Sequence, residues 1–171
     1  TSIIAKDILA LQHNQITALL TQAIIAESEN KYSKAFELYK KLFDHHSEKF
    51  GRYERLACLL AIAKNATEID PQTAFTTYEK ARNEDRLSIH AIYGAYSQTK
   101  ILQNWQKTIH YGELLLSVPS KIDKNFPLYM ELAEISLKKL NNPLQAQKYY
   151  LNALRIDANN FNALMGIAEL F

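Results

Sequence analysis

The sequence predicts an all-α solenoid of stacked, antiparallel helical hairpins, and three observations support this fold class. First, the 171 residues include only four glycines and four prolines, while 47% are hydrophobic. Such a composition excludes disordered, collagen-like and turn-rich β proteins. Second, a helical side-chain pattern recurs at intervals close to the ~34 residues of helix–turn–helix repeats. Third, residues typical of helix starts occur where this pattern predicts them.

The recurring pattern is a triplet with spacings of four and three residues, which place its members on one face of a helix. A small or short residue comes first, Tyr or Gly second, and Ala or Leu third. Successive triplets begin 39, 34 and 38 residues apart. The four triplets are Ala35, Tyr39 and Leu42; Ala74, Tyr78 and Ala81; Thr108, Gly112 and Leu115; and Ala146, Tyr150 and Ala153. Each triplet predicts the second helix of one hairpin.

The start of each second helix is predicted four residues before its triplet. Asp and Asn side chains accept hydrogen bonds from the free N–H groups of a first helical turn. Three of the four repeats carry such a residue at this position: Asp70, Asn104 and Asn142. Pro71 and Pro143 follow two of them, where a helix needs no N–H group. Lys31 occupies the position in the first repeat, so its cap is not defined.

An apolar-periodic segment precedes each of these helices and predicts the first helix of the hairpin. Its small residues let two helices approach closely. The expected core positions are Leu19, Ala23 and Ala26; Tyr53, Leu56, Ala57 and Leu60; Ile92, Ala95 and Tyr96; and Tyr129, Leu132, Ala133 and Ser136. The segments 44–51 and 117–125 are expected to connect hairpins, with Pro119 ending one helix and Pro127 opening the next.

These residues resemble the tetratricopeptide repeat (TPR), whose second helix carries an Ala, Tyr, Ala triplet before an Asp-Pro-like exit. The resemblance spans nearly the whole chain and is strongest at Tyr149–Phe171. Residues in the family register there are Ala153, Leu154, Asp157, Asn159, Asn160, Leu164, Ile167 and Ala168. The sequence departs from the family pattern at Leu42, Thr108, Gly112, Leu115 and Ala158. The resemblance implies a right-handed TPR-like superhelix.

The register predicts a single array over 1–171. Its repeats are expected at 15–50, 51–86, 87–124 and 125–158. Residues 1–14 are interpreted as the second helix of a preceding repeat, with its exit at Gln12–Asn14, and residues 159–171 as the first helix of a following repeat or a capping helix. We favour the interpretation that the chain was cut from a longer array, because an unstacked repeat exposes its apolar face.

The sequence does not predict an enzyme, a metal site or a cofactor. It contains no HExxH, GxSxG, GxGxxG or P-loop motif. The five histidines are expected to be solvated, and adjacent His45 and His46 point to different sides of a helix. Cys58, the single cysteine, lies in the apolar run LACLLAIA and is expected to be buried and unreactive.

Charge and hydrophobicity limit the classes of partner. A formal net charge of +2 does not indicate a nucleic-acid partner. The aromatic residues Tyr39, Tyr78 and Tyr150 fall on the helix-packing register, so they are expected in the core rather than stacked on bases. The longest apolar run, Leu56–Ala63, is far shorter than the ~20 residues that span a bilayer, so membrane insertion is not expected. We expect a cytoplasmic or periplasmic location, and the sequence indicates no oligomeric state.

The predicted function is a non-catalytic protein-interaction scaffold. Helical solenoids bind peptides or protein segments on an extended concave surface, here built from the first helices. The candidate groove residues are Thr17, Leu20, Ile24, Glu27, Glu54, Cys58, His90, Tyr93, Ser97, Met130 and Glu134. Tyr93 and Met130 are the expected anchors. The resemblance also argues against a C-terminal carboxylate as ligand, because the Lys and Asn residues of carboxylate-binding relatives are missing.

Two alternative functions stay open. A peptide-sensing regulatory domain would use the same groove for a free peptide. A helical-repeat RNA-binding module would read bases with polar residues at fixed places, but the first helices carry no repeated polar pattern.

Overall fold

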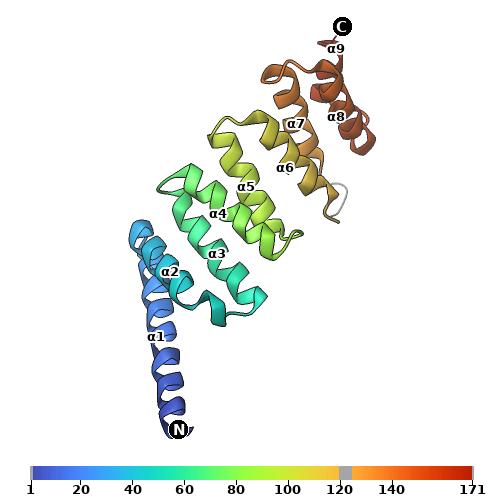
Figure 1. Cartoon of the computed structure of the whole chain (residues 1–171). Helices are drawn as coiled ribbons and strands as arrows, with labels where there is room; N and C mark the ends of the chain where they lie inside the picture. Colours follow the sequence, from blue (N-terminus) through green and yellow to red (C-terminus); the bar gives the residue numbers. More distant parts are fainter. Residues whose placement is uncertain (1, 120–124, 171) are drawn as a thin grey trace. The chain divides into compact units, whose positions relative to one another are not determined.

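The structure is a computed structural model that describes residues 2–119 and 125–170, with side chains from residue 14 onward. Within these residues the chain forms nine α-helices and one 3-10 helix, and no strand (Figure 1). It divides into two compact units, Thr1–Gln98 and Thr99–Phe171. The prediction of a mainly helical chain is confirmed.

The first unit contains two helical hairpins and most of a further helix. Helix α1 packs on α2, α2 packs on α3, and α3 packs on α4. The elements are α1 (Ser2–Ser28), α2 (Tyr32–His46), η1 (Ser47–Lys49), α3 (Arg52–Thr67), α4 (Pro71–Glu84) and α5 (Ile89–Ile101), which continues past the unit boundary.

The second unit repeats this arrangement. Helix α6 packs on α7, α7 on α8, and α8 on α9. Its elements after the end of α5 are α6 (Trp105–Ser117), α7 (Phe126–Lys138), α8 (Pro143–Ile156) and α9 (Phe161–Ala168). The connection predicted at 117–125 falls largely on residues 120–124, which lie outside the described residues.

The predicted helix starts are confirmed. The Asp70 side chain accepts hydrogen bonds from the backbone N–H groups of Gln72 and Thr73, at 3.2 and 2.9 Å. Asn104 and Asn142 cap α6 and α8 in the same way, by accepting from the backbone N–H three residues ahead. Lys31 is the N-cap residue of α2, and its side chain makes no capping hydrogen bond.

The triplet register is also confirmed, because ten of its twelve residues are buried. Tyr78 and Leu115 are half-buried. By contrast, two of the four core positions predicted for α3 are wrong: Tyr53 is 79% exposed and Ala57 is exposed, whereas Leu56 and Leu60 are partly buried and pack on the core. The buried residues of α3 are Cys58, Leu59, Ile62, Ala63, Asn65 and Ala66. The run LACLLAIA is apolar on every helical face, so its periodicity does not define the side that faces the core.

Two predicted helix ends also differ from the structure. Helix α1 continues through Gln12–Asn14, where an exit was expected, because no Pro or Gly interrupts residues 2–28. Helix α2 extends through His46 and is followed by η1, so that much of the expected connection 44–51 is helical.

The tight turn between the helices of a hairpin uses a left-handed residue in three repeats. Asn30, Gln103 and Asn141 have φ values of 56°, 53° and 48°, and each directly precedes an N-cap residue. Asn tolerates this conformation better than most residues. The capping residue and the residue before it therefore define the hairpin turn together.

Candidate functional site

An apolar hollow is lined by residues of α1, α2 and α3. Its volume is about 360 Å³. Glu54 is its single ionisable carboxyl group, and it accepts a hydrogen bond from the Gly51 N–H at 2.6 Å. The hollow, which we call hollow A, is lined by Ile16, Leu20, Tyr39, Leu42, Phe50, Glu54, Ala57, Cys58 and Ala61. Such a surface can receive an apolar side chain.

Cys58 lines hollow A and is also part of the hydrophobic core of the first unit. Its S–H group donates to the Tyr39 carbonyl oxygen, with 3.6 Å between sulfur and oxygen. Burial, with the nearby Asp44 carboxylate, raises the pKa of Cys58 to about 12. The thiol therefore stays protonated and contributes apolar surface rather than a nucleophile.

A second hollow, hollow B, lies beside hollow A where α1, α3, α4 and α5 meet. Its volume is about 330 Å³. It is lined by Glu27, Leu60, Ala61, Lys64, Tyr78, His90, Tyr93 and Gly94. Ala61 lines both hollows, so they adjoin along α3.

Glu27 holds three helices together at the edge of hollow B. Lys64 Nζ donates to its Oε1 at 2.6 Å, and Tyr39 Oη donates to its Oε2 at 3.0 Å. Burial opposes ionisation of this carboxyl, but the hydrogen bonds from Lys64 and Tyr39 prevail and lower its pKa. Glu27 is thus a fixed carboxylate whose charge is largely compensated.

Tyr93 lies at the rim of hollow B and is 60% exposed. Its ring centroid is 6.5 Å from that of buried Tyr96. Hollow B owes its depth to Gly94, because a Cβ there would lie 2.3 Å from Tyr78 Cε1.

The second unit has a more polar hollow between α7 and α9. Its volume is about 570 Å³. Half-buried Met130 lines it, together with Glu134 and Lys138, whose charged atoms lie 3.8 Å apart. This hollow C is lined by Phe126, Pro127, Met130, Glu134, Lys138, Tyr150, Asn160, Asn162, Met165, Gly166 and Glu169.

Eight of the eleven candidate residues line one of the three hollows. Leu20, Glu54 and Cys58 line hollow A; Glu27, His90 and Tyr93 line hollow B; and Met130 and Glu134 line hollow C. Thr17, Ile24 and Ser97 line none of these, although Thr17 and Ile24 are exposed. Ala57, Ala61 and Lys64 also line these hollows but were not among the predicted groove residues, and Ala57 was predicted to lie in the core. The small pair Ala57 and Ala61, four residues apart, was the available signal of a depression.

Comparison with known proteins identifies the fold. No protein-family model and no curated protein matches the sequence. Among solved structures, a tetratricopeptide repeat protein from Parabacteroides merdae has a TM-score of 0.70 at 15% identity, covering 92% of this chain and 59% of its own. This chain has the TPR fold. The predicted resemblance and fold class are confirmed.

Two further structures show the same TPR fold in this chain. The MamA protein has a TM-score of 0.68 at 16% identity, covering 92% of this chain and 81% of its own. The pilF protein of Pseudomonas aeruginosa has a TM-score of 0.56 at 16% identity, and the match covers 92% of this chain and 68% of the pilF chain. Hollow A has lining residues from α1 and α3, hollow B from α1, α3 and α5, and hollow C from α7 and α9.

In the described part of this TPR chain, no helix is both long and apolar enough to cross a membrane. No cluster of three or more His, Cys, Asp or Glu side chains there has the geometry to hold a metal ion. His45, His90 and His110 are exposed, but the expectation that all histidines are solvated is wrong for His46, which is buried. The His13 side chain lies outside the described residues.

Proposed function

We propose that this chain is a non-catalytic interaction module that binds an extended or helical segment of a partner protein along its first helices. The TPR fold supports this role, since repeat proteins of this kind bind peptides on surfaces that their first helices line. Side chains of such a segment enter hollows A and B on the first unit, or hollow C on the second unit. This function fits a scaffold in a larger assembly.

The observation that carries the proposal is the exposed apolar surface beside hollows A and B. Leu20, Ile24 and Tyr93 are 39%, 52% and 60% exposed. Large apolar groups that a monomer leaves in water around an apolar depression are typical of binding sites. A few such anchors supply most of the affinity in an interface.

Polar groups at the rims would orient the bound segment. The Glu54 carboxylate at hollow A and the His90 ring at hollow B are exposed. Exposed charges mainly affect specificity and the association rate, because water and salt screen them. A partner segment with apolar anchors and a basic residue opposite Glu54 therefore fits this surface best.

The test is a peptide selection followed by measured affinities. Peptides are selected from a displayed random library on the 171-residue chain, and their dissociation constants are measured by fluorescence anisotropy. Tyr93→Ala should weaken binding to peptides that occupy hollow B by about tenfold or more, as expected for an interface anchor. Met130→Ala should do the same for peptides that occupy hollow C.

Two control variants separate binding from folding. Tyr53 is exposed and lines none of the hollows, so Tyr53→Ala should leave affinity unchanged. Tyr78 fills the space beside Gly94, so Tyr78→Ala should lower the melting temperature. An equal loss of stability in the Tyr93, Met130 and Tyr78 variants would assign all three to the core and contradict the proposal.

The alternatives give different results in the same assay. A peptide sensor would bind short free peptides in these hollows and change the activity of a linked effector domain. An RNA-binding module would lose affinity steeply as salt rises, because phosphate contacts release counterions. Apolar anchoring in the hollows should be nearly independent of salt.

A further inference from the structure

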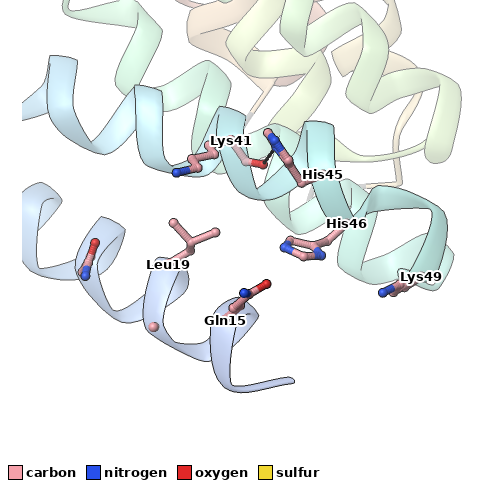
Figure 2. Close-up of a pocket in the computed structure, with 8 residues that line it drawn as sticks. Gln15, Leu19, Lys41, His45, His46 and Lys49 are labelled. Atoms are coloured by element: carbon pink, nitrogen blue, oxygen red, sulfur yellow. Dashed lines mark hydrogen bonds between the residues drawn. The ribbon is translucent and has the colours of Figure 1, made fainter. Parts of the chain in front are cut away.

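A pocket of different chemistry lies on another face of α1, where α2 and η1 pack beside it (Figure 2). Its volume is about 490 Å³. Ala18 and Leu19 of α1 form an apolar wall. Its polar lining consists of Gln15, Gln22, Lys41, His45, His46 and Lys49. None of these residues lines hollow A, B or C, so the pocket is separate from the proposed protein-binding surface.

Among the residues whose side chains the structure describes, every ionisable group that lines this pocket is basic. Lys41 and His45 come from α2 and Lys49 from η1, while Gln15 and Gln22 offer uncharged N–H donors. Glu37 and Asp44 line a neighbouring hollow that shares Lys41 and His45. No carboxylate of the described residues forms an ion pair with Lys41. The pocket thus combines positive charge with several hydrogen-bond donors.

His46 forms a buried part of the pocket wall. It is 9% exposed, and its Nδ1 is buried without a hydrogen-bond partner. Figure 2 shows its ring in the space between α2 and Gln15 of α1. A buried polar atom without a partner is costly and calls for an explanation. The pocket wall therefore contains a polar atom whose hydrogen-bonding capacity the protein itself does not satisfy.

The neighbouring histidine is held in place. His45 Nδ1 donates to the Lys41 carbonyl oxygen at 2.9 Å, which leaves Nε2 as its free ring nitrogen. The two imidazole centroids are 6.4 Å apart. Burial lowers the pKa of His46, and the charges of Lys49 and His45 lower it further. An additional positive charge is therefore unfavourable here, whereas an anion would be favoured.

We propose that this pocket binds the oxyanion of a small free molecule, of the phosphate or carboxylate type. Lys41 and Lys49 supply charge, His46 and the two glutamines supply N–H groups, and charged donors form the stronger hydrogen bonds. The pocket volume exceeds that of an inorganic phosphate ion, and Leu19 and Ala18 offer an apolar wall for the organic part of the ligand.

The test is an NMR titration of the 171-residue chain with inorganic phosphate and, separately, with acetate. Sodium chloride keeps the ionic strength constant and serves as the reference. The expected result is a saturable shift of the His46 and Leu19 signals with at least one of the two anions. Bound anion should also raise the pKa of His46. The NMR signals of exposed His90, which lies in hollow B, should not shift on addition of either anion.

Two matched variants test the role of the pocket charge. Lys41→Gln should raise the dissociation constant about fivefold or more, because it removes a charged donor. Lys80→Gln removes the same charge from an exposed position on α4 that does not line the pocket, and it should change affinity less than about twofold, as for a screened distant charge.

Three results would overturn the assignment. These are shifts that do not saturate with either anion, an equal response in sodium chloride, and an equal effect of both lysine variants. Saturation with phosphate alone or with acetate alone would support the site and identify the oxyanion type. The wild-type titration decides the question even if a variant folds poorly.

Discussion

At the scale of single residues, Gln103 occupies a position that its side chain does not favour. Its φ is 53°, while Asn30 and Asn141 fill the equivalent turns with a residue better suited to left-handed backbone. Gln103→Gly should therefore raise the free energy of unfolding by about 1 kcal/mol, since Gly adopts this φ without strain. Urea denaturation measures the change.

The matched control for this prediction is Gln106→Gly. Gln106 is exposed within α6, so glycine there should lower stability by about 1 kcal/mol through its poor helix propensity. If both variants were destabilised, the turn at Gln103 would not carry the inferred strain.

Single glycines permit close packing between helices at the same scale. A Cβ on Gly112 would lie 2.5 Å from Leu132 Cδ2, and one on Gly166 would lie 2.3 Å from the Tyr150 ring. Like Gly94, both have ordinary negative φ values, so close packing rather than backbone conformation requires glycine. The sequence alone shows an isolated Gly and does not distinguish these two causes.

At the scale of helices, α7 and α8 meet through small residues. Ala133 and Ala146 are both completely buried. Replacing either with Leu should overpack the contact and destabilise the fold by ~1–3 kcal/mol. Thermal and urea denaturation check this. Ala168→Leu on the exposed side of α9 should have little effect, and unchanged stability in all three variants would contradict the assigned packing.

Helix starts show how local chemistry and packing agree. Asp70 caps α4 through the backbone N–H groups of Gln72 and Thr73, and the Thr73 hydroxyl also donates to it at 2.5 Å. These hydrogen bonds lower the pKa of Asp70. The same residue was predicted as a cap from its distance to the Ala74 triplet, so sequence spacing located both the helix and its start.

For the whole molecule, these pKa shifts predict how stability depends on pH. The pKa of His46 is lowered in the folded state, mainly by burial, so the unfolded chain binds more protons below about pH 6.5, the usual pKa of His. Stability should be complete above that pH and fall as pH decreases toward the folded pKa. Asp70 and Glu27, whose pKa values are also lowered, add a further loss below about pH 4.5.

Urea midpoints measured from pH 8 to pH 3 test this dependence. His46→Gln should reduce the change between pH 7 and pH 5, because it removes the group that titrates there. His90→Gln, at an exposed position, should leave that change intact. A midpoint independent of pH between 7 and 5 in the wild-type chain would contradict the inferred environment of His46.

Comparison of particular residues shows why prediction succeeded in some places and failed in others. The triplets and the caps Asp70, Asn104 and Asn142 were predictable because helix periodicity and N-capping are local properties. The phase of α3 was not, because its run around Cys58 is apolar on all faces. Burial of His46 was also missed, since it depends on the approach of α1 rather than on neighbours in sequence.

The sequence by itself determined the class of fold, the hairpin register and most helix starts, since these follow from periodicity, caps and turns within about 35 residues. It also placed eight of eleven candidate residues beside hollows that only the structure reveals. Tertiary structure alone decided where the hollows lie, that Cys58 lines hollow A, and that Lys41, His46 and Lys49 share a pocket. Those features arise when side chains from different helices meet, and packing of separate helices is not encoded in the periodicity of any one of them.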